Sequence, residues 1–277
     1  MTTEIEALDR IVRQACRGEL VFPTNMAAAL RLQRALDDPE CHLDAAADLV
    51  LAEPLIAARL VAIANSVAYT RFGGHVSNVR TAVSLLGFKP LRSLVAVIVV
   101  RQLAEEIADP VLKRQAAELW RHSAHVAALA KVLAREFTDV DPETALFAGV
   151  VHEIDGFYLL SRTAEFPSLL EDAAASGRAT RATLAGCILN TLKVPKLIAA
   201  AVESLYVATP ALPPVTAGDV LSLANQLAAN PSPLAGWDGS DAAKGEATDF
   251  RVGDKTLQEL MAAHADEIEA TTAALMA

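Results

Sequence analysis

The stretch from Leu146 to Leu160 constrains the fold most strongly, because it places ionisable side chains inside an otherwise almost wholly apolar run. These side chains are His152, Glu153 and Asp155. If the stretch is helical, its spacing puts His152 and Glu153 on the inward half of the helix. Burying an unpaired charge costs several kcal/mol. The stretch therefore predicts a metal or ligand site, or the remnant of such a site in which the polar groups have new partners.

The composition of the whole chain favours helices over strands. Hydrophobic residues make up 53% of the 277 positions, which is ample for a sizeable core, whereas aromatic residues contribute only 5%. Alanine is abundant, and no segment shows a persuasive strand pattern or an internal repeat. The sequence therefore predicts an all-α fold. A chain of this length can hold one large domain or two small ones.

Several segments carry clear helix signals. Residues 109–137 begin with Asp-Pro and continue with a long apolar stripe, and residues 141–143 combine an acidic cap, a proline and an acid in the first turn. Residues 91–100, apart from Arg92 and Ser93, are apolar on all sides, which predicts a fully buried central helix. Residues 230–248 are rich in Pro, Gly, Ser and Asp, and we expect them to form a mobile loop.

Charge and cysteine usage narrow the classes of function. The formal net charge of −10 argues against nonspecific binding to nucleic acid, although it leaves room for a local basic patch. Cys16, Cys41 and Cys187 are an odd and scattered set, which predicts reduced thiols without a disulfide framework. The first residues lack an apolar signal core, and the apolar run at 94–100 is too short to cross a bilayer. We therefore expect a soluble, cytoplasmic protein with no membrane contact.

Short motifs along the chain occur in a characteristic order. They are Leu20–Pro23, Asp38–Pro39, Glu53–Pro54, Ala64–Ser66, Leu85–Gly87, Trp120–Ser123, Ala148–Ile154 and Val194–Pro195. This order resembles that of the HDOD domain, a bacterial relative of the HD metal-dependent phosphohydrolases, from about residue 19 to past residue 206. The resemblance implies a multi-helix HD-like bundle. We expect a single domain over residues 1–277, with an N-terminal helical part at 1–108 and an HD-like helical part at 109–277.

The residues at the metal-ligand positions depart from those of the HD enzymes. In those enzymes, histidines and an aspartate on several helices hold metal ions that activate water against a phosphoester. Matched position by position, His122 and His152 keep their imidazoles. The other positions, which carry an aspartate, a histidine and a His-His pair in the family, are occupied by Glu153, Arg181, Leu205 and Tyr206. The glycine three residues after the motif histidine is Asp155.

Arg181 is the main objection to a metal at these positions. A fixed guanidinium about 4 Å from a dication costs roughly 8 kcal/mol at an effective dielectric near 20. A micromolar binding free energy is also about 8 kcal/mol. We therefore expect no metal, no other cofactor and no catalytic residue, and a remnant pocket formed by His122, His152, Glu153 and Arg181. Arg181 can instead pair with Glu153 or Asp155 and neutralise a buried acid.

Each of these residues also has a plain structural interpretation. His122 is expected to be a core histidine hydrogen-bonded to a carboxylate such as Glu153, and His125, one turn along the same helix, to be solvated. His152 and Glu153 fit a structural polar network as well as they fit a ligand pocket. Asp155 is expected to face solvent or to cap a helix break, although Asp155 and Tyr206 are also candidates for binding another group.

The resemblance implies a non-catalytic output or adaptor module in signal transduction, which acts through contacts with other signalling proteins. The replaced ligand residues favour this hypothesis, and no second catalytic constellation is visible in the sequence. The alternative hypothesis is a residual metal-dependent phosphohydrolase or a nucleotide-binding protein that uses His122, His152 and Glu153.

Overall fold

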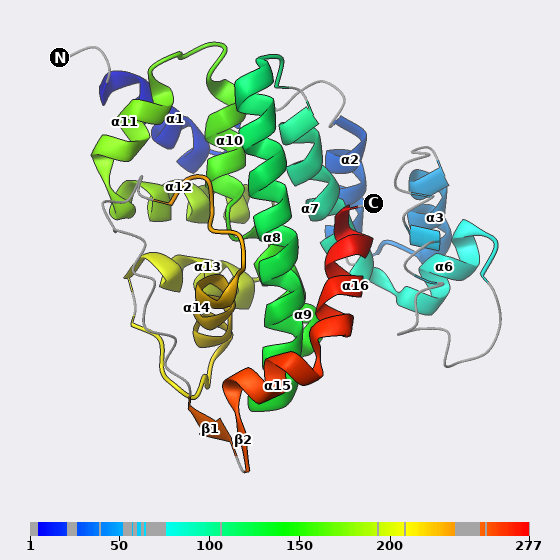
Figure 1. Cartoon of the computed structure of the whole chain (residues 1–277). Helices are drawn as coiled ribbons and strands as arrows, with labels where there is room; N and C mark the ends of the chain where they lie inside the picture. The colour runs from blue at the N-terminus through cyan, green and yellow to red at the C-terminus, as the bar shows by residue number, and fades with distance from the viewer. Residues whose placement is uncertain are drawn as a thin grey trace. The chain divides into compact units, whose positions relative to one another are not determined.

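A computed structural model of the chain describes residues 5–20, 27–38, 40–51, 57, 60, 61, 64, 76–105, 107–192, 194–207, 209–235, 250–252 and 254–276. These residues are overwhelmingly helical, which confirms the predicted all-α class (Figure 1). None of the described helices is long and apolar enough to cross a membrane. The motif residues at 21–23, 39, 53–54 and 65–66 lie outside the described part of the chain.

The chain divides into two compact units. The large unit comprises Met1–Val21 and Leu103–Ala277, and the inserted unit comprises Phe22–Gln102. Helix α1 (Ile5–Cys16) therefore belongs with the C-terminal part of the chain, whereas the sequence grouped it with residues 1–108. This difference has a physical cause, because α1 packs against α11 (Leu169–Ser176) and α12 (Arg178–Thr191).

The inserted unit contains α2 (Ala27–Asp37), α3 (Leu43–Leu51), α6 (Val79–Leu86) and most of α7 (Phe88–Glu105). Helix α3 packs against both α2 and α6. The side chain of Asn78 caps α6 by accepting a hydrogen bond from the backbone N–H of Thr81. The predicted apolar helix is confirmed, because α7 buries its residues on several sides. Its buried side chains include Leu91, Leu94, Val95, Ile98, Val99, Val100 and Leu103.

Helix α8 (Pro110–Phe137) is the central element of the large unit, and it packs against α9 (Pro142–Val151), α14 (Ala217–Leu227) and α16 (Ala265–Met276) (Figure 1). Its predicted start is confirmed, since the Asp109 carboxylate accepts hydrogen bonds from the N–H groups of Val111 and Leu112. Asp141 caps α9 in the same way. Two acidic caps, each followed by proline, therefore set the start of α8, which carries His122, and of α9, which leads directly into His152.

A glycine allows α8 and α9 to approach closely. A Cβ atom on Gly149 would lie 2.4 Å from the Cα atom of Ala127, which is far inside van der Waals contact. Only a residue without a side chain fits here, because the opposing atoms are backbone atoms of a buried helix. This contact brings the end of α9 close to α8, three residues before His152.

The remainder of the large unit consists of α10 (Ile154–Arg162), α11, α12, α13 (Lys196–Val207) and the C-terminal elements. A short hairpin joins β1 (Arg251–Val252) to β2 (Lys255–Thr256) in antiparallel register, with Arg251 opposite Thr256. The sequence had indicated no strand. The hairpin leads into α15 (Leu257–Ala263), which Thr256 caps through a reciprocal bond pattern with Glu259.

The predicted mobile loop at 230–248 lies mostly outside the described residues, but its first six residues are described. Leu234 is buried there, with only 1% of its surface exposed. A Cβ atom on Gly156 would lie 2.4 Å from the Leu234 side chain, so the two residues pack closely. The beginning of this segment is thus part of the core.

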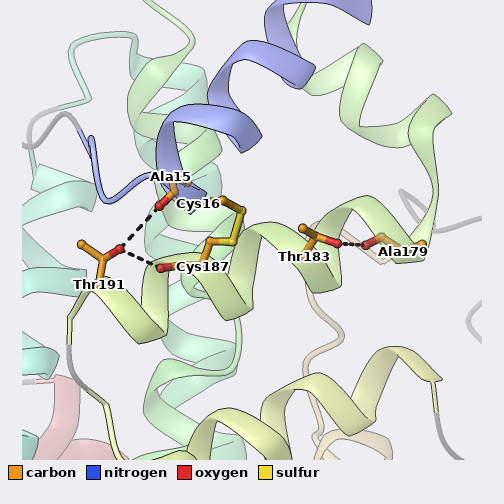
Figure 2. Close-up of a disulfide and its surroundings, with 6 residues drawn as sticks. All are labelled: Ala15, Cys16, Ala179, Thr183, Cys187 and Thr191. Atoms are coloured by element: carbon orange, nitrogen blue, oxygen red, sulfur yellow. Dashed lines mark hydrogen bonds between the residues drawn. A yellow bond between two sulfur atoms is a disulfide. The ribbon is translucent and has the colours of Figure 1, made fainter.

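The prediction of three reduced thiols is wrong for two of them. A disulfide joins Cys16, the last residue of α1, to Cys187 in α12 (Figure 2). Cys41 remains a free cysteine. The sequence could not show this pairing, because the two cysteines are 171 residues apart and meet only through the packing of α1 on α12.

We expect Gly149→Ala to lower the free energy of unfolding by about 1–3 kcal/mol or more, the usual cost of overpacking a core. The Cβ would meet backbone atoms of Ala127 that cannot move independently. Urea denaturation measures the effect. Gly186→Ala is a matched control, because its Cβ meets only the flexible end of the Glu203 side chain and alanine favours a helix. Equal effects of both substitutions would contradict the close-packing explanation.

Candidate functional site

The candidate site lies where three parts of the large unit meet. Helix α9 ends at Val151 and α10 begins at Ile154, so the chain turns at His152 and Glu153. Helix α8 contributes His122 and α12 contributes Arg181. Five polar side chains at this point are buried. They are His122, His152, Glu153, Asp155 and Arg181, with exposed fractions of 1%, 2%, 6%, 0% and 6%.

Arg181 joins the two acidic residues of the site. Its Nε donates to Asp155 Oδ2 at 2.7 Å, and its Nη2 donates to Glu153 Oε2 at 2.8 Å. The guanidinium also lies over the ring of Tyr206, 5.6 Å from the ring centroid. The sequence predicted that Arg181 would pair with Glu153 or Asp155, and the structure shows that it binds both. These are charge-assisted hydrogen bonds, the strongest kind available to a buried carboxylate.

The expectation that Asp155 faces solvent or caps a break is wrong. Its side chain is fully buried. Besides the bond from Arg181, its Oδ1 accepts a hydrogen bond from the Tyr206 hydroxyl at 3.0 Å. The reason is the turn at residues 152–153, which reorients the chain so that the first turn of α10 points toward α12 and α13. Tyr206 therefore belongs to the site as a hydrogen-bond donor.

The two histidines contact one another. Their Nε2 atoms lie 3.2 Å apart, whereas His122 was expected to bind a carboxylate. The Nδ1 atom of His122 lies 2.8 Å from the carbonyl oxygen of Asn230, and that of His152 lies 2.6 Å from the carbonyl oxygen of Gly149. The sequence did not indicate Asn230, because a backbone carbonyl in a turn carries no side-chain signal.

These contacts determine where the hydrogens lie. Each Nδ1 faces a carbonyl oxygen, which can only accept, so each Nδ1 carries a hydrogen. The two Nε2 atoms then present lone pairs to one another unless a positive charge separates them. A proton held by one ring and accepted by the other meets this need, and so would a cation bound by both. Burial opposes a positive charge at this point, because it lowers the pKa of His152.

Burial and charge both influence the titration of the site. Burial is the largest influence on the pKa of His152 and lowers it from 6.5 to about 4. Burial raises the pKa of Glu153, but Arg181 and the two histidines outweigh it, so that pKa lies below its usual value. Burial dominates at Asp155 and raises its pKa. Burial also raises the pKa of Tyr206 well above its usual value.

His125, the second histidine of the His-x-x-His spacing on α8, was expected to be solvated. Its side chain is instead half-buried, and its Nδ1 accepts a hydrogen bond from the backbone N–H of Ala229 at 3.2 Å. Burial lowers its pKa. His125 therefore fixes the backbone next to Asn230, whose carbonyl holds His122, and is not part of the buried cluster.

Three of these residues offer a ligand set that a metal ion could use. Among the described residues, His122, His152 and Glu153 offer ligand atoms that all lie within 4.8 Å of one another. Both imidazoles also have the N–H···O=C support typical of metal ligands. The carboxylates fit less well, because the Arg181 guanidinium binds Oε2 of Glu153 and Oδ2 of Asp155 and would lie beside any ion that they bound.

The chain belongs to the HDOD domain family, which matches it over residues 22–194. The chain is also similar to solved structures that share its fold. One is a candidate metal-dependent phosphohydrolase from Shewanella amazonensis SB2B, at 19% identity and a TM-score of 0.65, with 100% of this chain and 99% of that chain covered. Another is an HDOD domain protein of unknown function from Geobacter sulfurreducens, at 20% identity and a TM-score of 0.56, with 98% of each chain covered.

A third similar structure is a candidate signal transduction protein from Marinobacter aquaeolei VT8. It is 18% identical, with a TM-score of 0.53, and the match covers 99% of this chain and 67% of that chain. At these identities, the similarity shows a common fold. No curated protein matches the chain.

Arg181→Ala should lower the free energy of unfolding by about 3–5 kcal/mol, because it leaves two buried carboxylates without their partner. Urea denaturation at neutral pH measures this. The matched control is Arg178→Ala on the same helix, whose exposed guanidinium binds the carbonyl of Leu205. We expect the control to cost about 1 kcal/mol or less. Adding Glu153→Gln and Asp155→Asn to Arg181→Ala should restore part of the loss, and a strictly additive triple variant would contradict the pairing.

His152 should make the stability of the protein depend on pH. Its pKa is near 6.5 when unfolded and about 4 when folded, so the unfolded state binds the proton more tightly. The stabilisation is fully present above pH 6.5 and is lost as the pH falls toward 4, a change of roughly 3 kcal/mol. Denaturation curves of His152→Gln should lack this part of the pH dependence. Exposed His42→Gln should keep it, and parallel curves for wild type and His152→Gln would refute the assignment.

Proposed function

We propose that the protein is a non-catalytic signal-transduction module that acts through contacts with other proteins. The observation that carries this proposal is the buried Arg181 guanidinium, bonded to both Glu153 and Asp155. A module of this kind needs the stable helical body of the family but not its chemistry. The membership in the HDOD family supports the proposal, as does the similarity to a candidate signal transduction protein.

Charge is the first argument against a bound dication. The two carboxylates carry two negative charges when both are ionised, and Arg181 neutralises one of them. Burial lowers the pKa of Arg181, but Asp155, Tyr206 and Glu153 raise it further, so the guanidinium keeps its proton. The pocket then has at most one surplus negative charge to attract a metal ion.

The energy of moving Arg181 aside is the second argument. The guanidinium is 6% exposed and bonds through two of its nitrogens, so displacing it would break two charge-assisted bonds. If it stayed in place about 4 Å from a dication, the repulsion would be roughly 8 kcal/mol at an effective dielectric of 20. Either course removes most of a micromolar binding free energy.

The proposed partners are other signalling proteins. The acidic net charge of −10 disfavours nucleic acid as a partner. As part of the same proposal, the module works in the cytoplasm without a cofactor.

The second candidate function is a residual phosphohydrolase or nucleotide-binding protein. It is favoured by one observation, the convergence of ligand atoms from His122, His152 and Glu153 within 4.8 Å. Two similar solved structures are also named as candidate phosphohydrolases. If such a site bound a single ion, Glu153 would have to bind it through the oxygen that Arg181 leaves free, or give up its bond to Arg181.

Metal analysis and a turnover assay separate the two functions. We expect protein purified without chelator to hold well below one equivalent of iron, manganese or zinc per chain. It should hydrolyse bis(p-nitrophenyl) phosphate no faster than His152→Ala does with these ions added. One bound equivalent, together with turnover that is lost in His152→Ala, would overturn the non-catalytic assignment. Arg181→His serves as a gain-of-ligand comparison and should raise metal occupancy above that of the wild type.

A further inference from the structure

The Cys16–Cys187 pair lies where small reagents can reach it. Cys16 is exposed at the C-terminal end of α1, and Cys187 is half-buried in α12 (Figure 2). The two Cα atoms are 4.7 Å apart, so the sulfur atoms can meet without a shift of the backbone. Solvent-exposed disulfides are typically the reducible ones, in contrast to those sealed in a core.

The position of the pair in the chain gives the bond a distinct role. Helix α1 packs on the large unit through an apolar face in which Leu8, Ile11 and Ala15 are buried. After Val21 the chain leaves the large unit for the inserted unit and returns at Leu103. Without the disulfide, α1 depends on its noncovalent packing to stay in place on the large unit.

The side-chain hydrogen bond between the end of α1 and α12 is weak. The Thr191 hydroxyl lies 2.9 Å from the carbonyl oxygen of Cys187 and 3.5 Å from that of Ala15 (Figure 2). A hydroxyl group has one proton to donate, and here the nearer acceptor is the Cys187 carbonyl in the same helix. The Thr191 hydroxyl therefore holds α1 only weakly. The disulfide is thus the strong link between the end of α1 and the helix that carries Arg181 six residues earlier.

We infer that Cys16 and Cys187 form a redox-sensitive disulfide link, which a peroxide closes and a thiol reductant opens. Closing it holds α1 on α12, and opening it frees α1 to detach locally. The inference does not depend on the proposed function, because neither cysteine takes part in the contacts of the buried cluster.

The closing reaction needs a two-electron oxidant, and hydrogen peroxide is the class that we name. The thiolate of exposed Cys16 attacks one peroxide oxygen, the O–O bond breaks, and a sulfenic acid and hydroxide result. The thiolate of Cys187 then attacks the Cys16 sulfur and expels the second oxygen as hydroxide. The two sulfurs are oxidised, the peroxide is reduced, and the two thiol protons leave with the two oxygens as water. Thiol–disulfide exchange with a dithiol reverses the bond.

Thiol counting on the native full chain tests the chemistry. The sequence has three cysteines, so reduced protein should show three reactive thiols under denaturing conditions. After hydrogen peroxide treatment it should show one, and dithiothreitol should restore three without denaturant. Oxidised Cys41→Ser should show none, whereas Cys16→Ser and Cys187→Ser should each keep two. A disulfide that involves Cys41, or a bond that resists dithiothreitol until the protein unfolds, would overturn the inference.

Hydrogen exchange of the backbone amides in α1 tests the structural effect. Reduction of wild-type protein should make the amides of residues 8–16 exchange about tenfold faster or more, with α8 unchanged. Cys187→Ser should exchange like reduced wild type, whether or not a reductant is present. Cys41→Ser should exchange like wild type in each of the two redox states. Because reduced wild type carries no substitution, the test survives a failure of either serine variant to fold. Equal exchange in the oxidised and reduced states would overturn the inference.

Discussion

The two hydrogen bonds from Arg181 to Glu153 and Asp155 are the interaction on which the interior of the large unit depends. A carboxylate without a partner at this depth would be very costly, and here two lie two residues apart in sequence. The planar guanidinium reaches both because Nε and Nη2 point along different edges of the fork. A lysine in its place would offer one charged point and could not bridge them in the same way. The pair of bonds ties α12 to the turn between α9 and α10.

The histidine pair is oriented in the way that a pair of metal ligands is often oriented. Backbone carbonyls of Gly149 and Asn230 hold both imidazoles with their Nε2 atoms facing one another, as the ligands of an ion would be held. Arg181 supplies one positive charge to the neighbouring acids, whereas a dication would bring two. The guanidinium therefore neutralises part of the buried charge that a metal ion would otherwise neutralise.

The sequence predicted helices well where local signals act alone. The Asp-Pro starts at residues 109 and 141 and the apolar run of α7 all lead to the expected elements. It also predicted Arg181 as a partner of the acids, because a buried acid that lost its metal needs a cation nearby. Helical periodicity failed at Asp155, since it fixes direction only within an unbroken helix and the chain turns at His152–Glu153. The carbonyl of Asn230 and the Cys16–Cys187 bond arise from tertiary packing and leave no local signal.

The disulfide closes the polypeptide into a covalent ring that contains the whole inserted unit and the part of the large unit that precedes Cys187, from Leu103 onward. A protease that cuts one peptide bond anywhere between Cys16 and Cys187 would open this ring but release no fragment. The segment that precedes the cut would still be attached through sulfur to the segment that follows it. Nicked and intact molecules would then have the same mass apart from one added water. A denaturing gel would show two fragments only after the disulfide is reduced.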